Sequence, residues 1–298
     1  MAYHESVLLD ESVDGLNIKP NGIYVDATFG GGGHSRSILK KLKKGQLFAF
    51  DQDADVIANI INDERFVLID QNFRFMKQFL RLKGVQKVDG ILADLGVSSH
   101  QFDTALRGFS IRQDGPLDMR MNHQQTLTAR EVVNNYDVDD LSRIFKTYGE
   151  LKNGYSLAKQ IVKTRDVASI NTTEELKAAI SDRLPVQKRN KILAQIFQAI
   201  RIEVNDELKA LKDMLKQSSD LLKDGGRMSI ISYHSLEDRL VKNIIKSGNF
   251  EGIIEKDFFG NQKTVFKPIN KKPIVPTEQE ISNNPRSRSA KLRIGEKM

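Results

Sequence analysis

Four consecutive glycines, Gly30–Gly33, separate a short apolar run from a segment with helical spacing. The run Ile23–Val25 before them is typical of a buried strand, and residues 35–42 after them place apolar side chains on one helix face. Glycine lets the backbone turn tightly and lets a ligand approach with no Cβ in the way. A strand, a glycine turn and a helix in this order predict the opening unit of a nucleotide-binding α/β domain.

An acidic residue closes the next predicted strand. Residues 47–50 form a second apolar run, and Asp51 follows it directly. In nucleotide-binding α/β folds a carboxylate about twenty residues beyond the glycine loop binds the ribose hydroxyls. The spacing therefore predicts that Asp51 binds the ribose of a nucleoside.

The glycine pattern departs from the common phosphate-binding motifs. Gly30 and Gly32 fit the first two glycines of the dinucleotide fingerprint, but Ser35 stands where the third is required. The sequence contains no Walker loop. A glycine loop without a pyrophosphate pattern favours an adenosine that lacks phosphates, and S-adenosylmethionine is the common ligand of that kind. A tight turn without a ligand and a nicotinamide dehydrogenase stay open as alternatives.

The composition excludes several kinds of chemistry. The chain has no cysteine, which rules out disulfides, thiolate nucleophiles and zinc–thiolate sites and fits a reducing compartment. Its five histidines show no metal-ligand spacing. The first residues are acidic where a signal peptide is basic, and no apolar run approaches the length of a membrane span. We therefore expect a cytoplasmic protein with no metal and no membrane partner.

The net charge of +7 is concentrated near the end of the chain. Residues 261–298 carry nine basic and three acidic side chains. A basic flank on a small-molecule-binding domain favours a polyanionic substrate such as a nucleic acid, although a solvated basic tail is an equal alternative. If the segment binds RNA, deleting residues 285–298 should weaken RNA binding and reduce its salt dependence.

The order of predicted elements indicates an α/β fold with a helical insertion. Strand and helix patterns alternate four times up to residue 99, and only helix patterns follow between residues 126 and 204. Among the helix patterns, Thr128 with Glu131 and Thr172 with Glu175 have the spacing of capping boxes. Strand patterns return at residues 227–232, 250–254 and 291–294. We predict a Rossmann-like class I methyltransferase sheet over residues 1–108 and 206–298, and an all-helical substrate-recognition domain over residues 109–205.

Long strings along nearly the whole chain resemble the bacterial RsmH (MraW) family. They are His4–Leu9, Ala27–Ser35, Asp94–Ser99, Arg107–Met121, Tyr148–Gly149, Phe197–Leu208, Ser229–Arg239 and Asn284–Ile294. The resemblance implies an S-adenosylmethionine-dependent methyltransferase that acts on N4 of a cytidine in small-subunit (16S) ribosomal RNA. Methylation of another nucleic acid and a non-catalytic ribosome-assembly role remain alternatives. The sequence leaves open whether the substrate is free RNA or the small ribosomal subunit. It also leaves open whether the protein forms a homodimer.

The same resemblance implies a set of cofactor contacts. They fall in the glycine loop, at the ends of the second and fourth strands, and after the third. These residues are Gly32, Gly33, His34, Asp51, Phe73, Asp94 and Gln101. His100 departs from the family pattern, which commonly has a proline there, and this affects the expected geometry of Gln101.

Three residues are candidates for catalysis. Asp94 ends the fourth predicted strand, where its carboxylate could contact the acceptor amine, the cofactor or both. The polar loop 107–121 follows that strand and carries Asp118 and Arg120, which we expect to help hold the target cytidine. An ion pair that only fixes the loop is the alternative. His34 and His234 are more typical of structural histidines than of catalytic ones.

Overall fold

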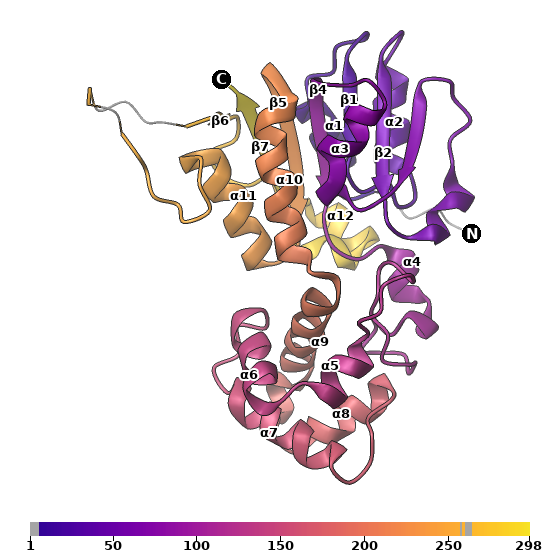
Figure 1. Ribbon diagram of the computed structural model, residues 1–298, viewed down its shortest axis with the longest axis vertical. Coiled ribbons are helices and arrows are strands. Elements are labelled where there is room, and N and C mark those ends of the chain that lie inside the picture. The colour runs from indigo at the N-terminus through magenta and orange to yellow at the C-terminus, as the bar shows by residue number, and fades with distance from the viewer. Residues whose placement is uncertain (1–5, 257, 260–263) are drawn as a thin grey trace. The chain divides into compact units, whose positions relative to one another are not determined.

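The structure is a computed structural model that describes residues 6–256, 258–259 and 264–298. His4 and Glu5, which belong to the family-like string at the start of the chain, lie outside the described residues. By their internal contacts, the residues form two compact units. The sheet unit combines Met1–Gly96 with Leu208–Met298, and the helical unit spans Val97–Glu207 (Figure 1).

The sheet unit is built on seven strands in the order β3-β2-β1-β4-β5-β7-β6. Strands β1 to β5 pair in parallel, whereas β7 runs antiparallel to both β5 and β6. Because the chain reverses its direction of travel across the sheet between β1 and β4, their carboxyl ends form the switch point where α/β folds bind ligands. The strands are β1 Ile23–Asp26, β2 Gln46–Asp51, β3 Phe66–Asp70, β4 Val88–Asp94, β5 Leu222–Ser232, β6 Phe266–Pro268 and β7 Lys291–Lys297.

Helices cover both faces of this sheet, which explains the continuous apolar runs of the strands. On β1, Tyr24 packs in a core cluster with α1 and α2, and Val25 packs in the opposite cluster with α3, α10 and α11. The helices are α1 Leu9–Gly15, α2 Gly33–Lys41, α3 Met76–Leu82, α10 Glu207–Leu221, α11 Ser235–Ser247 and α12 Glu278–Asn283. Short 3₁₀ helices span Ala54–Asn59 (η1), Phe73–Phe75 (η2) and Pro285–Ser289 (η5).

The helical unit has its own apolar core. Two of its helices begin with the capping boxes predicted at Thr128 and Thr172, and both are confirmed. The helices are α4 Ser99–Asp103, α5 Ala129–Asn135, α6 Val138–Thr147, α7 Gly154–Arg165, α8 Thr173–Ser181 and α9 Arg189–Asn205, with 3₁₀ helices η3 Ala105–Arg107 and η4 Val186–Lys188. None of the helices in the described residues is long and apolar enough to cross a membrane.

The helical unit begins at residue 97, earlier than the boundary at 108/109 expected from the sequence. Val97 and Phe102 pack against the helical core. The buried Arg107 donates from Nη2 to the backbone oxygens of Arg120 and Met121, at 3.0 and 3.1 Å. Residues 97–108 therefore fold with the helices, because their apolar and guanidinium groups find partners there.

The prediction of a strand at residues 250–254 is wrong. The Asn249 side chain accepts hydrogen bonds from the backbone of Gly252 and Ile253, and Asn243 donates to the Phe250 oxygen. Side-chain amides thus satisfy the backbone groups that a strand would use in its ladder. At the start of α11, the His234 side chain caps the helix by accepting the Glu237 N–H.

The basic C-terminal segment is not a tail. Strand β7 lies between β5 and β6, and its Leu292 and Ile294 are buried. The Arg293 guanidinium forms an ion pair with Asp238 on α11 at 2.5 Å. Deleting residues 285–298 would remove this strand from the sheet, so the truncation cannot report on RNA binding alone.

Candidate functional site

Three carboxylates stand side by side at the carboxyl edge of the sheet. Asp26, Asp51 and Asp94 are the last residues of β1, β2 and β4, which are neighbours in the order β2-β1-β4. Burial raises the pKa of each carboxyl group to about 6. Three carboxyl groups with raised pKa values thus lie where α/β folds bind ligands, which makes them candidates for a functional site.

The glycine loop that follows β1 is open on one side and packed on the other. A Cβ added at Gly30 or Gly31 would meet no protein atom within 4 Å. At Gly32, where φ is +76°, a Cβ would come within 2.9 Å of the Phe29 ring, and at Gly33 within 2.0 Å of Ser6 Oγ. The loop is therefore fixed from behind and leaves a cradle in front of its first two glycines.

Asp51 holds this cradle from the neighbouring strand. Its Oδ2 accepts the Gly30 N–H at 2.8 Å, and its Oδ1 accepts the Asp53 N–H at 2.9 Å. Asn59 completes the arrangement by donating to the Gly30 oxygen at 3.1 Å. Each carboxylate oxygen keeps a further lone pair, so Asp51 can hold the loop and still accept a hydroxyl hydrogen bond from a ligand.

Asp26 is a residue of this site to which the sequence analysis gave no role. Its fully buried carboxylate accepts the Ser35 hydroxyl at 2.6 Å and the Thr28 N–H at 3.1 Å. These bonds tie the end of β1 to the start of α2 and fix the path of the loop between them. The signal in the sequence was its position, directly before the loop at the end of the first strand.

The buried Asp26 carboxylate makes stability depend on pH. Its pKa is about 6 in the folded chain against an ordinary value of 3.8, so between these values the folded state binds more protons than the unfolded state. The free energy of unfolding should therefore fall as the pH rises from about 4 to about 6. We expect Asp26→Asn, which cannot ionise, to raise it by about 1–3 kcal/mol at neutral pH. At about pH 4, the increase in the free energy of unfolding caused by Asp26→Asn, measured by urea unfolding, should be much smaller.

Asp63 supplies a control in which the expected change in stability at neutral pH is a loss and not a gain. Its ion pair with Arg65 lowers the pKa of that carboxyl group to about 2. Asp63→Asn should therefore reduce stability at neutral pH, and the loss should disappear only in stronger acid. If Asp26→Asn gave the same change at both pH values, or a loss at neutral pH, the account of the buried carboxylate would be wrong.

Asp94 is held in one orientation. Its Oδ1 accepts the Tyr233 hydroxyl at 2.8 Å, and its backbone N–H donates to Thr28 Oγ1 at 2.7 Å. Within the described part of the chain, Oδ2 accepts no hydrogen bond. Burial raises the pKa of Asp94, and the nearby His34 and the Tyr233 hydroxyl act against that rise. One oxygen of Asp94 is thus fixed and the other is available to a ligand.

His34 lies deep in the structure. Its Nε2 is 3.2 Å from the backbone oxygen of Val7, and burial lowers the pKa of the imidazole. The ring is therefore neutral at physiological pH and ties the N-terminal segment to α2. This contact is structural, and a cofactor contact of His34 stays a prediction.

Phe73 and Gln101 take part in local structure. Phe73 begins η2 and packs half-buried against the core shared by α3 and α10. Gln101 is buried in the helical unit, where its Oε1 accepts the Ser98 N–H at 3.0 Å and its own N–H donates to Ser98 Oγ at 3.2 Å. The side chain thus completes a capping box at the start of α4. Cofactor contacts of both residues stay predictions.

Asp118 and Arg120 bind each other in the helical unit. The Arg120 Nε and Nη2 atoms donate to the two Asp118 oxygens at 2.9 and 2.7 Å. Arg120 Nη1 also donates to the backbone oxygens of His123 and Gln125. Although burial acts to raise it, this pairing lowers the pKa of Asp118. The pair fixes the shape of the loop, as the alternative interpretation holds, and a contact with the substrate stays a prediction.

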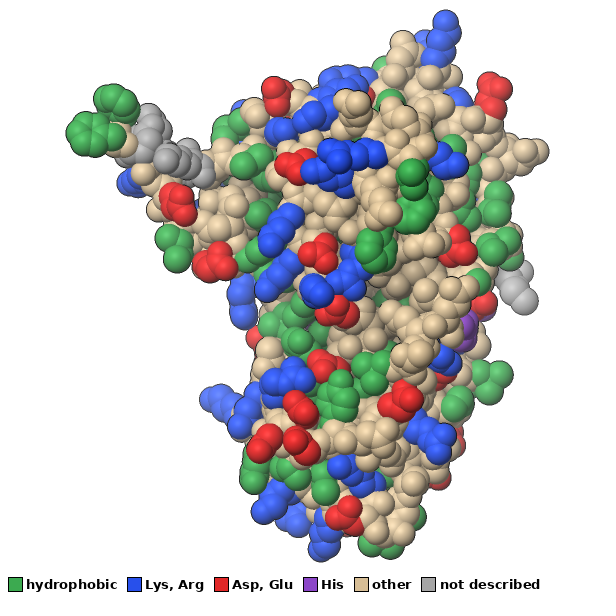
Figure 2. All heavy atoms as spheres, in the orientation of Figure 1, with side chains coloured by type: hydrophobic (Ala, Val, Ile, Leu, Met, Phe, Trp, Pro, Cys, Tyr) green, Lys and Arg blue, Asp and Glu red, His purple; other side chains and the backbone are tan. Residues whose placement is uncertain are grey.

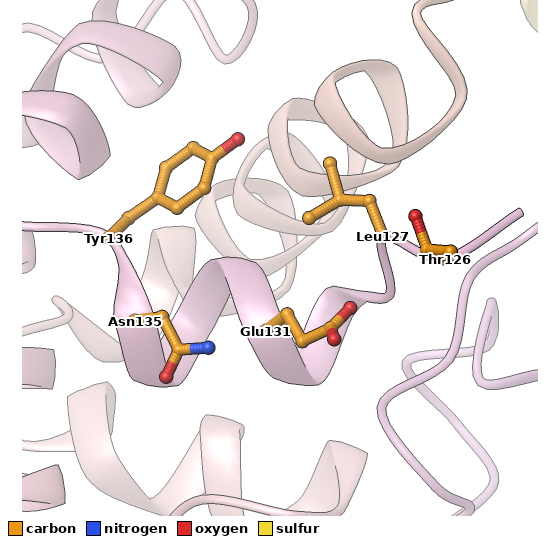
Figure 3. A pocket seen from close by; sticks show the side chains of 5 residues that line it. All are labelled: Thr126, Leu127, Glu131, Asn135 and Tyr136. Carbon is orange, nitrogen blue, oxygen red and sulfur yellow. The ribbon is translucent and has the colours of Figure 1, made fainter.

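A shallow hollow of about 250 Å³ also lies in the helical unit (Figure 3). It is lined by Thr126, Leu127, Glu131, Asn135 and Tyr136. Glu131 is engaged in the capping box of α5, and the Tyr136 hydroxyl donates to Glu203 at 3.1 Å. These polar groups already serve the fold, so the hollow adds no reactive group to the candidate site.

Comparison with known sequences gives one family over the full length. The family model described as the MraW methylase family matches residues 1–298. A protein named ribosomal RNA small subunit methyltransferase H from Flavobacterium johnsoniae is 60% identical, covering 100% of this chain and 99% of its own. Proteins of the same name from Amoebophilus asiaticus and Bacteroides thetaiotaomicron are 57% and 56% identical, covering 99% and 100% of this chain and 96% and 98% of their own.

Solved structures are more distant. An rRNA methylase from Streptococcus thermophilus aligns with a TM-score of 0.42 and 14% identity, over 97% of this chain and 95% of its own. A Streptococcus mutans protein in complex with SAH aligns with a TM-score of 0.44 and 14% identity, over 99% and 100%. These scores are too low to carry an argument.

Proposed function

Because the chain belongs to the MraW methylase family, we propose that it transfers a methyl group from S-adenosylmethionine to the exocyclic N4 amine of a cytidine in 16S ribosomal RNA. The observation that carries the chemistry is Asp94, which presents one carboxylate oxygen beside the glycine loop and the row of acids. The names of the full-length relatives support ribosomal RNA as the substrate. The cytidine N4 position follows from the family resemblance of the motifs.

The residues of the sheet unit fit this donor. S-adenosylmethionine supplies a methyl group on a sulfonium, from which an amine nitrogen can accept it directly. The cradle before Gly30 and Gly31 has room for a ligand against the backbone. A row of three carboxylates suits a cationic ligand with ribose hydroxyls and would repel a pyrophosphate, which disfavours a dinucleotide. We propose that the donor is held by Gly32, Gly33, His34, Asp51, Phe73 and Asp94 of this unit.

Asp94 acts on the acceptor. The lone pair of an exocyclic cytosine amine is drawn into the ring, so the amine is a weak nucleophile. A carboxylate that accepts one amine N–H returns electron density to the nitrogen as its bond to the methyl carbon forms. The electrons of the broken carbon–sulfur bond stay on sulfur, and the amine releases one proton toward Asp94. Because the donor already carries a good leaving group, alignment of the two reactants is the main task of the protein.

Donor preference and product identity test the function directly. Calorimetry should show binding of S-adenosylmethionine and none of NAD. Incubation with labelled S-adenosylmethionine and small-subunit ribosomal RNA should then label a single cytidine, and nucleotide mapping identifies the modified atom. A non-catalytic assembly factor would bind RNA without transferring label. We place the reaction in the cytoplasm, on free RNA or on the small subunit, and a homodimer remains a prediction.

The loop of the helical unit should affect the acceptor more than the donor. If Asp118 and Arg120 shape a cytidine-binding loop, Asp118→Ala and Arg120→Ala should each slow methyl transfer roughly 10-fold or more. The affinity for S-adenosylmethionine, measured by calorimetry, should stay the same. The exposed Arg112 in the same loop offers a matched control, and Arg112→Ala should leave both values unchanged. Wild-type rates in the Asp118 and Arg120 variants would remove the loop from the mechanism.

Helix α7 offers a surface for RNA. Tyr155, Lys159 and Lys163 are exposed and follow one another at four-residue spacing, which places them on one face of the helix. Lys159 Nζ lies 5.7 Å from the centre of the Tyr155 ring. On the face seen in Figure 2, basic and acidic side chains are interspersed. Lysines beside an exposed aromatic ring suit a phosphate backbone with an unstacked base, so we propose that this face contacts the RNA.

Charge removal on α7 should weaken RNA binding in a salt-dependent way. We expect Lys159→Gln with Lys163→Gln to lower RNA affinity and to reduce the slope of log affinity against log salt by roughly 0.7–0.9 for each lost phosphate contact. Binding of S-adenosylmethionine should not change. A control with the same loss of charge is Lys41→Gln with Lys77→Gln in the sheet unit, where both lysines pair with acids. Equal salt slopes for the two double variants would contradict an RNA contact by α7.

A further inference from the structure

We propose that Tyr233 is a positioning residue for methyl transfer: its hydroxyl holds Oδ1 of Asp94 so that Oδ2 faces the acceptor amine. The proposal rests on the proposed function, in which Asp94 accepts a hydrogen bond from that amine. Tyr233 directly follows β5, the strand that pairs in parallel with β4. Its hydroxyl lies 2.8 Å from Asp94 Oδ1, although the two residues are 139 positions apart in the sequence.

The tyrosine is itself held from the backbone side. Its N–H donates to Glu237 Oε2 on α11 at 3.0 Å, and His234, the next residue, caps that helix. Gly96, whose φ of +96° favours glycine, lies in ordinary van der Waals range of the ring: a Cβ there would be 3.7 Å from it. The strand end and the helix cap therefore hold the phenol where it can reach Asp94.

The direction of the hydrogen bond follows from the chemistry of the pair. Burial, with Asp94 close by, raises the pKa of Tyr233 well above its ordinary value, so the phenol keeps its proton and donates it. A donor on Oδ1 favours the ionised form of Asp94, which burial disfavours. The tyrosine thus does two things at once: it selects one orientation of the carboxylate, and it keeps the carboxylate able to accept.

Other titratable groups face Asp94 from the elements packed against it. They are Asp26 at the end of β1, His34 on α2 and Glu237 on α11, while Glu280 on α12 faces Tyr233. Asp26 and Glu237 favour the protonated form of Asp94, whereas His34 favours the ionised form when its ring carries a proton. Removal of the Tyr233 hydroxyl leaves these three groups in place. It removes the hydrogen bond that favours the ionised form of Asp94. The pKa of Asp94 should therefore rise.

The test compares two buried tyrosines that each lose only a hydroxyl. Tyr233→Phe removes the donor to Asp94, and Tyr24→Phe removes the hydroxyl that accepts the Lys19 N–H at 2.7 Å. We expect Tyr233→Phe to lower kcat roughly 10- to 100-fold near neutral pH, with KM for S-adenosylmethionine nearly unchanged. The acid limb of its kcat profile should move to higher pH by roughly one unit. Tyr24→Phe should keep the wild-type profile.

Two readouts separate positioning from a general structural effect. If Tyr233 acts through Asp94, the deficit of Tyr233→Phe narrows as the pH rises, and in an Asp94→Asn background the same change has no further effect on kcat. A deficit that is equal at every pH, or that adds in full to that of Asp94→Asn, overturns the proposal. So does a profile that matches that of Tyr24→Phe.

A measurement without turnover keeps the proposal independent of the reaction. Carbon-13 NMR of labelled aspartate carboxyl groups, assigned by comparison with Asp94→Asn, reports the titration of Asp94 in the free protein. The Asp94 pKa should be higher in Tyr233→Phe than in the wild type, and an unchanged pKa overturns the inference. Failure of the proposed function looks different, because the wild-type protein would then transfer no methyl group to cytidine N4 while the NMR result still stands.

Discussion

Asp94→Ala should lower kcat for cytidine methylation roughly 100- to 10,000-fold. The affinity for S-adenosylmethionine should fall far less, by roughly tenfold at most. The reason is geometric: Asp94 Oδ2 is the oxygen that the Tyr233 hydroxyl leaves available, and a poorly nucleophilic amine needs an acceptor at that place. Single-turnover transfer of label from S-adenosylmethionine to ribosomal RNA, with calorimetry of the donor, measures both quantities.

Substitution of Asp94 by asparagine separates the effect of its charge from the effect of its hydrogen bond to Tyr233. Asp94→Asn keeps an acceptor oxygen for Tyr233 but carries no charge, so it should retain the fold and recover little of the rate. Because burial of the Asp94 carboxylate is unfavourable, Asp94→Asn should be no less stable than the wild type at neutral pH. A wild-type rate in Asp94→Ala would exclude Asp94 from the chemistry, and a loss of donor affinity as large as the loss of rate would make it a donor-binding residue only.

Asp51→Ala should abolish most of the affinity for S-adenosylmethionine, with a loss of roughly 100-fold. Two effects act together: the ligand loses the carboxylate predicted to bind its ribose, and Gly30 loses the acceptor of its N–H. Asp51→Asn should fall between alanine and the wild type, because its amide oxygen can still hold one of the two N–H groups. Calorimetry with S-adenosylmethionine and with adenosine alone measures the loss.

The next strand provides the control for this prediction. Asp70 ends β3 directly beside Asp51 in the sheet, and its side chain is exposed. Asp70→Ala removes the same charge from the same sheet edge and should leave donor affinity close to that of the wild type. If Asp51→Ala bound the donor as well as Asp70→Ala does, the assignment of the glycine loop and its acid to S-adenosylmethionine would fail.

A row of three buried carboxylates should favour a cationic ligand. Each of Asp26, Asp51 and Asp94 is disfavoured as an anion by burial, and neighbouring members of the row repel one another. A positively charged ligand relieves both penalties, whereas a neutral one relieves neither. Part of the donor affinity can therefore come from electrostatic strain already present in the free protein.

Local patterns predicted the α/β sheet with a helical insertion correctly. The strand before Gly30, the helix after it and the capping boxes at Thr128 and Thr172 depend on residues within one or two turns of each other. Such patterns fail where side chains compete for the backbone, as Asn243 and Asn249 do around residues 250–254. They also cannot tell a basic tail from a basic strand, because the partner of Arg293 is 55 residues away.

The sequence by itself determined the fold class, the glycine loop and the acids that end β2 and β4, because each is set by short-range spacing. Only the tertiary structure decided which groups meet at the site. Asp94 gains Tyr233 as its partner because β5 pairs beside β4 after the helical insertion has intervened, and no local pattern carries that pairing. Hydrogen bonding and burial depend on such distant neighbours, so a residue type and its position could nominate Asp94 but could not orient it.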